Sequence, residues 1–236
     1  MSYQKKQLSI LCVFITIELV LGILVQTTSN TLNTIVSFSS VVLAFLYSLL
    51  LIKKNKDTFL TSVGLFTTVC ADIFLVVMNP RIQLPAMFFF SVTQICYFLR
   101  LYFNEDSKTR KIHLIVRIIV TLVSLGITTL VLKDKTDLLS LISLFYYANL
   151  IINIVFSFTG RQKSIIFSIG LFLFACCDLL IGFNIMSSAY IELSPGTFFY
   201  FLAHPGFNLA WIFYVPAQVL IALSNTSLKE KEKALI

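Results

Sequence analysis

Two aspartates end two similar apolar runs, "GLFTTVCAD" (Gly64 to Asp72) and "GLFLFACCD" (Gly170 to Asp178). An ionisable side chain inside a bilayer costs several kcal/mol, so it is rarely kept there without a function. Two carboxylates that face one desolvated cavity cannot both ionise comfortably, which leaves an acid and a base at neutral pH. Hydrolysis needs such a pair, and we predict that Asp72 and Asp178 are catalytic. The structural alternative is that each aspartate is protonated and hydrogen-bonds a neighbouring helix.

The rest of the chain has the composition of a membrane protein. Of its 236 residues, 58% are hydrophobic and 12% are charged, whereas a soluble domain carries about 25% charged residues. Segments of about 20 mostly apolar residues, long enough to span a bilayer, fill the chain. Eight are predicted, at about 8–26, 33–52, 58–78, 85–103, 112–132, 138–158, 164–186 and 206–224. We therefore predict an all-α polytopic bundle that forms one integral membrane domain over residues 1–236.

The last apolar region is too long for one simple helix. Pro205 and Gly206 are expected to break it, because proline and glycine both disfavour a helix interior. The preceding piece, "TFFYFLAH", is therefore predicted to be a separate interfacial or re-entrant segment.

The loops carry most of the Lys and Arg residues, and their distribution predicts the topology. With the N-terminus inside, the inner side holds Lys5, Lys6, Lys53, Lys54, Lys56, Arg100, Lys108, Arg110, Lys111, Arg161, Lys163, Lys229, Lys231 and Lys233. Only Arg81, Lys133 and Lys135 fall outside, and Arg117 lies within the fifth span. This favours eight spans with both termini in the cytoplasm, in the plasma (inner) membrane. The net charge of +7 is thus a topology signal, and no nucleic-acid partner is expected.

The two aspartate motifs fall on the third and seventh spans, which run in the same direction. Each aspartate lies 14 residues after the start of its span, at Thr58 and Ser164, or about 21 Å along a helix. The matched depth predicts two parallel, related four-helix halves, at about 1–106 and 107–236.

Polar side chains follow helical spacing on three other spans. They are Ser91, Gln94 and Tyr97; Tyr146, Asn149 and Asn153; and Trp211, Tyr214 and Gln218. Glu18 adds a carboxylate near the middle of the first span, and Arg117 is placed to extend its charge to the inner interface. As residues that contact the substrate we predict Glu18, Gln94, Tyr97, Tyr146, Asn149, Tyr214 and Gln218. The structural alternative is that each stripe ties helices together.

Several catalytic classes lack their residues in this chain. Two histidines, His113 and His204, cannot form a three-histidine zinc site. Neither a Gly-x-Ser-x-Gly elbow nor a phosphate-binding glycine loop occurs. The Tyr-Asp and Gly-x-Gly-Asp motifs of intramembrane aspartyl proteases are replaced by "CAD" and "CCD", although "VPAQ" partly matches their Pro-Ala-Leu. No metal or cofactor is expected.

The order of these motifs resembles the YhhN family of integral membrane proteins, which includes the lysoplasmalogenases. The matching pieces are "GLFTTVCADIFLV", "SVTQICY", "GLFLFACCDLLIG" and "YVPAQVLIALS". "IEL" at Ile17 to Leu19 is similar to the acidic residue that members often carry in their first span. Tyr146 or Tyr147 matches the tyrosine of their sixth span.

The resemblance implies hydrolysis of the vinyl ether bond of a lysoplasmalogen, with a lysophospholipid as substrate and membrane lipids as surroundings. Asp72 and Asp178 would then share the acid and base roles, while Gln94, Tyr97, Tyr214 and Gln218 orient water and the ether oxygen. This chain departs from the family pattern in two places. Members commonly have a histidine at the position of Gln94, and many have a Lys-Pro pair at the start of span two, where this chain has neither residue. The alternatives are a small-molecule transporter with parallel repeats and a lipid-binding member without catalysis.

Overall fold

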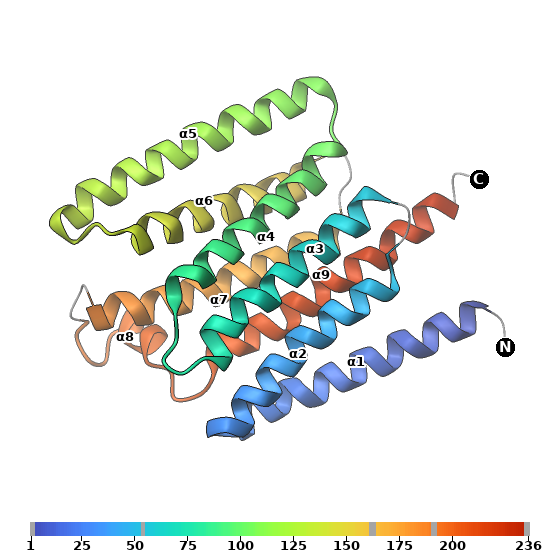
Figure 1. The fold of residues 1–236 in the computed structure, drawn as a ribbon, viewed down its shortest axis with the longest axis horizontal. Helices are drawn as coiled ribbons and strands as arrows, with labels where there is room; N and C mark the ends of the chain where they lie inside the picture. Colours follow the sequence, from blue (N-terminus) through green and yellow to red (C-terminus); the bar gives the residue numbers. More distant parts are fainter. Residues whose placement is uncertain (1–2, 53–54, 161–163, 190–192, 234–236) are drawn as a thin grey trace.

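The computed structural model describes residues 3–52, 55–160, 164–189 and 193–233, which form helices and loops without a strand (Figure 1). Eight helices in this part of the chain are long and apolar enough to cross a membrane. They are α1 (Tyr3–Thr27), α2 (Asn30–Leu50), α3 (Lys56–Asp72) with its π-helical extension η1 (Ile73–Val77), α4 (Gln83–Phe103), α5 (Ser107–Leu132) with the 3-10 turn η2 (Lys133–Lys135), α6 (Leu138–Thr159), α7 (Ile165–Ala189) and α9 (Leu209–Lys233). The predicted all-α polytopic bundle is confirmed.

The predicted spans agree with the helices, with small shifts at their ends. The eighth span begins at Leu209 because a short loop follows Pro205. The preceding "TFFYFLAH" forms a separate short helix, α8 (Phe198–Ala203), as the break predicted. Four basic residues used for the topology prediction, Lys53, Lys54, Arg161 and Lys163, lie outside the described residues.

Polar side chains start the helices where the chain turns back between spans. Asn55 accepts a hydrogen bond from the backbone N–H of Asp57 at 3.0 Å and starts α3. Asp137 starts α6 through reciprocal bonds with Ser140, a capping box that satisfies otherwise unpaired backbone donors. The backbone N–H of Ser140, followed by its hydroxyl, lowers the pKa of the exposed Asp137 carboxyl.

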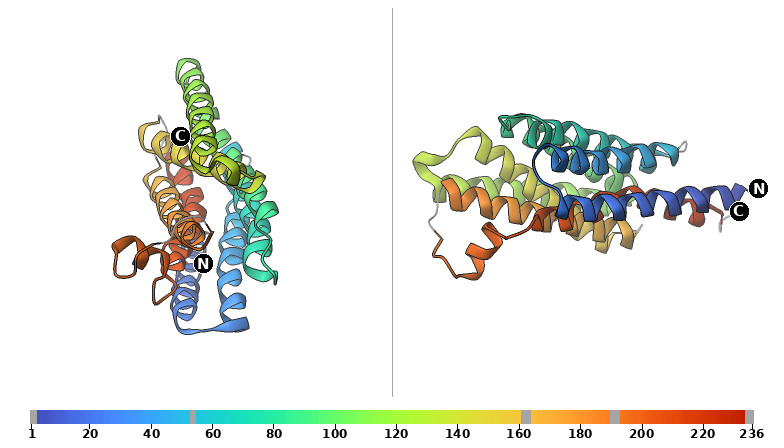
Figure 2. Two further views of the ribbon diagram at one scale, coloured as in Figure 1. Left: turned by 90° about the vertical axis from the view of Figure 1, so that its left-hand side faces the viewer. Right: turned by 90° about the horizontal axis from the view of Figure 1, so that it is seen from below.

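The helices pack in one order in both halves of the chain. Neighbours pair as α1 with α2, α2 with α3 and α3 with α4, and again as α5 with α6, α6 with α7 and α7 with α9. The halves meet where α4 packs on α6 and α2 packs on α9. Looking along the bundle, α5 lies at one edge and α1 with α2 at the other (Figure 2). This arrangement accommodates the predicted repeat, which stays a prediction.

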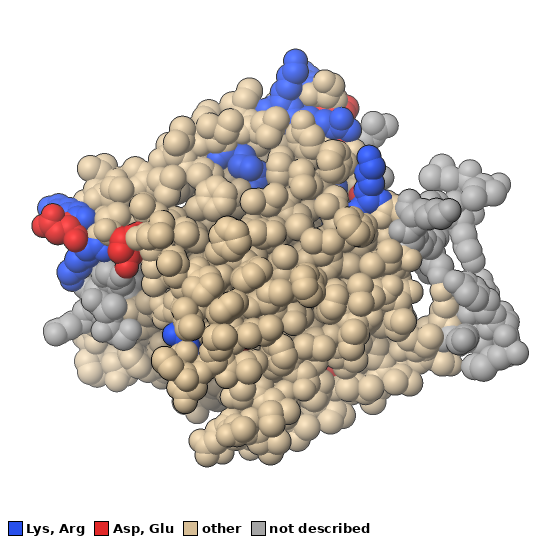
Figure 3. Space-filling model, in the orientation of Figure 1, with Lys and Arg blue, Asp and Glu red and all other residues tan. Residues whose placement is uncertain are grey.

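The outer surface suits a lipid environment. Large apolar side chains are exposed along the spans, with Ile23 on α1 and Leu130 on α5 at 65% and 75% exposure. The charged side chains gather mainly at the two ends of the bundle (Figure 3). Both chain termini lie at the same end of the bundle (Figure 1), as an even number of crossings requires.

Two glycines allow close helix packing at corresponding positions of the aspartate motifs. A Cβ on Gly64 of α3 would overlap the ring of Tyr97 on α4. A Cβ on Gly170 of α7 would lie 2.9 Å from Cγ1 of Ile221 and 3.2 Å from the carbonyl oxygen of Ala217, both on α9. Each motif therefore begins with a glycine at a tight helix crossing and ends with an aspartate eight residues further on.

Candidate active site

Asp72 is the last residue of α3, in the interior of the bundle. Its side chain is 2% exposed, and its Oδ2 accepts a hydrogen bond from the hydroxyl of Tyr214 on α9 at 2.7 Å. The chain widens into the π-helical turn η1 directly after this residue. Such turns are frequent at functional sites because they change where side chains point. The bond joins the third and the last membrane-length helices.

Asp178 on α7 has a similar partner. Its Oδ2 accepts a hydrogen bond from the hydroxyl of Tyr146 on α6. Tyr146 is 3% exposed, whereas Asp178 is only partly buried. The next residue, Leu179, is 44% exposed on the lipid-facing side. Asp178 is therefore the more exposed of the two residues.

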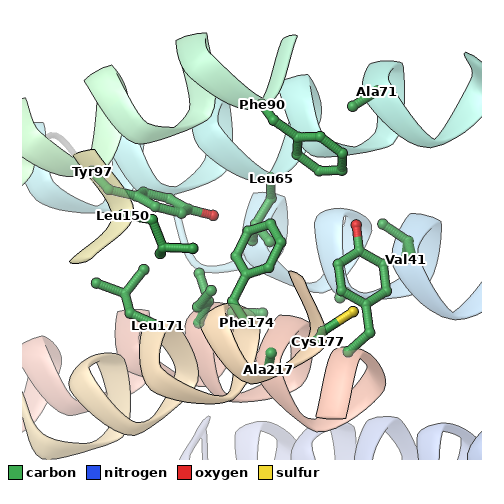
Figure 4. Close-up of a cluster of buried hydrophobic side chains, with 14 of the residues drawn as sticks. Val41, Leu65, Ala71, Phe90, Tyr97, Leu150, Leu171, Phe174, Cys177 and Ala217 are labelled. Atoms are coloured by element: carbon green, nitrogen blue, oxygen red, sulfur yellow. The ribbon is translucent and has the colours of Figure 1, made fainter. Parts of the chain in front are cut away.

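The two pairs flank one aromatic side chain, Phe174 on α7. The centroid of its ring lies 5.5 Å from that of Tyr214 and 6.4 Å from that of Tyr146. Figure 4 shows Phe174 reaching from α7 towards Phe90, whose ring centroid is 5.8 Å away. Tyr214 bonds to Asp72 and Tyr146 bonds to Asp178, so Phe174 links the two pairs. The structure thus brings both predicted catalytic residues to one region.

The tyrosines leave part of each carboxyl group available for chemistry. Within the described residues, each aspartate is bonded through Oδ2, so Oδ1 can face a substrate or a water molecule. Gln218 lies one helical turn beyond Tyr214, is fully buried, and has no partner for either amide atom in the described chain. A buried amide without a partner is uncommon, so Gln218 is suited to binding a polar ligand.

Three of the residues predicted to contact the substrate bond to or pack against groups other than the two aspartates. Glu18 is 3% exposed between α1 and α2, where its Oε2 accepts a hydrogen bond from Ser40 at 2.6 Å. Tyr97 packs over Gly64 and makes an edge contact with Phe167, with ring centroids 5.4 Å apart. Gln94 accepts hydrogen bonds from Asn153 through its backbone and side-chain oxygens. None of the three bonds directly to either aspartate.

Asn149 also faces a partner other than the aspartates. Its Oδ1 accepts a hydrogen bond from Arg117 on α5, and Oδ1 of Asn153 accepts another at 2.7 Å. The expectation that Arg117 extends to the interface is therefore wrong. The two asparagines hold its guanidinium against α6, because they give it acceptors that the surrounding lipid lacks.

Sequence reasoning missed a second polar cluster at the other end of α4. Arg100, counted as a loop charge, is 3% exposed and donates to Thr61 at 2.7 Å and Ser224 at 2.8 Å. Its guanidinium also stacks 4.0 Å from the ring centroid of Phe167. A pocket of about 20 Å³, enough for about one water molecule, lies beside it and is also lined by Asp57. The sequence did contain a signal for this burial. Arg100 follows Tyr97 by three residues, and so continues the spacing of the polar face formed by Ser91, Gln94 and Tyr97.

Metal ligands are not grouped in the described part of the chain. No cluster of three or more His, Cys, Asp or Glu side chains among these residues is placed to hold a metal ion. The side chains that bond to the aspartates are instead the phenols of Tyr214 and Tyr146.

Eight membrane-length helices around a pair of interior carboxyl groups define a multi-pass integral membrane protein with a buried polar site. The sequence profile of the YhhN family matches residues 32–225, which is most of the chain. The chain therefore belongs to the YhhN family, as the resemblance predicted. The match includes both aspartates and both tyrosines and leaves Glu18 outside. Comparison with curated proteins and with solved structures gave no match.

Proposed function

We propose that this protein hydrolyses the vinyl ether bond of lysoplasmalogens, releasing a fatty aldehyde and a glycerophospho head group. The observation that carries the proposal is the pair of interior carboxyl groups, each held by a tyrosine hydroxyl. Membership of the YhhN family, with which lysoplasmalogenase activity is associated, supports the same reaction class.

The chemistry needs one acid and one base. The protonated aspartate gives its proton to the alkene carbon that bears the alkyl chain, and the carbon bonded to the ether oxygen becomes part of an oxocarbenium ion. The ionised aspartate takes a proton from water, whose oxygen adds to that carbon and forms a hemiacetal. The aspartate that took the proton from water now gives it to the glycerol oxygen, and the C–O bond to glycerol breaks. The hemiacetal O–H gives its proton to the other aspartate, and the aldehyde remains. The overall reaction consumes one water molecule and returns both carboxyl groups to their starting states.

The tyrosines orient the two carboxyl groups for these steps. Each donates to one carboxyl oxygen, so the other oxygen can face the alkene carbon or the water. Positioned acids and bases of this kind contribute about 10²–10⁴-fold to a rate. Gln94, which stands where relatives have a histidine, cannot exchange a proton near neutral pH. In this chain the proton transfers are therefore assigned to the aspartates alone.

Access from the lipid supports a hydrolase over a transporter. Asp178 is partly exposed on a helix whose next residue faces the surroundings of the bundle. At the end of the bundle near Arg100, a network of hydrogen bonds joins α4 to α3 and α9. A transporter needs access from both ends, whereas a lipid substrate can enter from the side.

The test is aldehyde release by purified protein in lipid nanodiscs, from a lysoplasmalogen and from its saturated alkyl-ether analogue. We expect aldehyde from the vinyl ether alone, and less than about 1% of that rate after Asp72→Asn or Asp178→Asn. Asp134→Asn is the matched control, because Asp134 is exposed at the far end of α5. Full activity in either catalytic variant would contradict the assignment. No aldehyde from the unaltered protein would favour lipid binding without catalysis.

A further inference from the structure

Arg117 is a positive charge within the membrane-length part of α5 that has no negative partner. It is the one Lys or Arg between Lys111 and Lys133. Its hydrogen bonds go to the neutral side-chain oxygens of Asn149 and Asn153, and no carboxylate of the described chain pairs with it. A charged side chain inside a bilayer is costly unless it is compensated. An anion is therefore the expected ligand.

The two asparagines are oriented for this task. The amide nitrogen of Asn153 donates to Gln94, and that of Asn149 donates to the carbonyl oxygen of Phe145 at 2.7 Å. Both carbonyl oxygens are consequently turned towards Arg117. The guanidinium plane also lies 4.1 Å from the ring centroid of Phe98 on α4, which fixes it from a third helix. A charge held by three helices is a built feature of the fold.

The guanidinium retains free binding capacity. It has five N–H donors, and each terminal nitrogen uses one of its two on an asparagine, which leaves one further N–H on each. Nε is itself buried and has no partner in the described chain. Arg117 is partly exposed rather than buried. Figure 3 shows basic surface between the two ends of the bundle as well as at those ends. An anionic group of a lipid can reach such a position from the side.

The position along α6 relates this charge to the proposed active site. Tyr146, which holds Asp178, precedes Asn149 by three residues, or about 4.5 Å along the helix. Helix α6 runs towards the end of the bundle where α1 begins and α9 ends (Figure 1), so Asn149 and Asn153, which follow Tyr146 in this helix, are nearer to that end. A lysolipid presents its phosphate, its glycerol, its vinyl ether and its chain in that order. Its phosphate at Arg117 would place the vinyl ether deeper, towards Asp178.

We propose that Arg117, held by Asn149 and Asn153, binds the phosphate of the lysophospholipid substrate while its vinyl ether lies at Asp178. This inference rests on the proposed hydrolysis. Arginine suits the role because its planar fork of N–H donors matches phosphate oxygens. The substrate would come from the leaflet on the side of the two termini.

The kinetic test compares two vinyl ether substrates, a lysoplasmalogen and the corresponding 1-alkenylglycerol without phosphate. We expect Arg117→Gln to lower kcat/KM for the lysoplasmalogen about 10–100-fold, mainly through KM, as the loss of a charge-assisted contact predicts. The same variant should change kcat/KM for 1-alkenylglycerol less than about twofold, because that substrate has no phosphate to lose. Arg117→Lys should restore part of the loss. Lys111→Gln, which removes an exposed charge from the same helix, should affect neither substrate.

A second variant keeps the test valid if Arg117→Gln fails to fold. Asn149→Asp would place a carboxylate against the guanidinium and compensate its charge in place, while Asn153 keeps its two bonds to Gln94. We expect it to weaken use of the lysoplasmalogen and to spare 1-alkenylglycerol. Equal losses on both substrates in both variants would mean that Arg117 only supports the fold, and would overturn the proposal.

A binding measurement separates this proposal from the proposed reaction. In nanodiscs, the saturated alkyl-ether lysophospholipid should bind more tightly than the alkylglycerol to the unaltered protein, and Arg117→Gln should remove the difference. That result would support the phosphate site even if no vinyl ether were cleaved. Equal binding of the two lipids would overturn it. Competition by millimolar inorganic phosphate would assign the site to free phosphate instead, and would overturn the lipid assignment.

Discussion

The substitution Tyr214→Phe keeps the aromatic ring and deletes the hydrogen bond that joins Asp72 to Tyr214 of α9. The bond is 2.7 Å long and its acceptor is 2% exposed. Hydrogen bonds to charged groups contribute about 1.5–3 kcal/mol in proteins, whereas those between membrane helices average about 0.6 kcal/mol and reach about 1.7 kcal/mol. Because the Asp72 carboxyl is buried, we expect a value at the upper end of the membrane range, about 1–2 kcal/mol.

A double-mutant cycle measures that contribution without the cost of the cavity. Tyr214→Phe, Asp72→Ala and the double variant are unfolded with a denaturing detergent, and the fluorescence of Trp211 is followed. Trp211 is the single tryptophan, and its ring centroid lies 5.2 Å from that of Tyr214. The cavity left by Asp72→Ala is present with either residue at 214, so it cancels in the coupling energy.

The crossed pair supplies the control. Tyr146 bonds to Asp178 and not to Asp72, so the coupling between Tyr146→Phe and Asp72→Ala should be below about 0.5 kcal/mol, as for sites without a direct contact. If the Asp72 and Tyr214 coupling were also below about 0.5 kcal/mol, the pairing would not exist in the membrane. Equal couplings in the direct and crossed cycles would also refute the reasoning.

Three further predictions concern packing, the second polar cluster and topology. Gly170→Val should lower the free energy of unfolding by about 1–3 kcal/mol, because the new side chain would collide with Ile221. The control is Gly126→Val, which has open space around it. It should change the free energy of unfolding by less than about 0.5 kcal/mol in the same assay. Arg100→Ala should lower the free energy of unfolding by about 3 kcal/mol, because it removes two buried hydrogen bonds and a ring contact. Arg81→Ala, at an exposed site, should change the free energy of unfolding by less than about 0.5 kcal/mol. If both termini are cytoplasmic, a C-terminal fluorescent-protein fusion should fluoresce in a bacterial host and a C-terminal alkaline phosphatase fusion should be inactive. Active phosphatase at that end would reverse the topology.

The number and position of the spans followed from the sequence because a bilayer sets the length of an apolar helix. The separate α8 was predicted for a similarly local reason, since Pro205 and Gly206 cannot continue the helix. Asp72 and Asp178 stood out because unpaired carboxylates are rare in apolar runs. These signals are local, and each is contained in one stretch of about 20 residues.

The partners of the site residues were not predictable in the same way. The spacing of Tyr146 and Tyr214 indicated a polar face, but which aspartate each tyrosine meets depends on how distant helices pack. Arg117 illustrates the difference most clearly. Its sequence position gives its depth, whereas the direction of its side chain is decided by acceptors on α6. Arg100 was missed because a charge near the end of a span serves equally well as a topology signal.

The bond between Tyr214 and Asp72 also bears on how the protein is made. The two residues are 142 positions apart, so at about 5–20 residues per second the ribosome needs roughly 7–30 s to pass from one to the other. The bond between Tyr146 and Asp178 spans only 32 positions and can form soon after α7 is inserted. Asp72 therefore enters the membrane with α3 and cannot bond to Tyr214 until α9 is synthesised. A chain that stops before α9 would keep an unsatisfied carboxyl group in its interior, which makes insertion of α9 the step that completes the site.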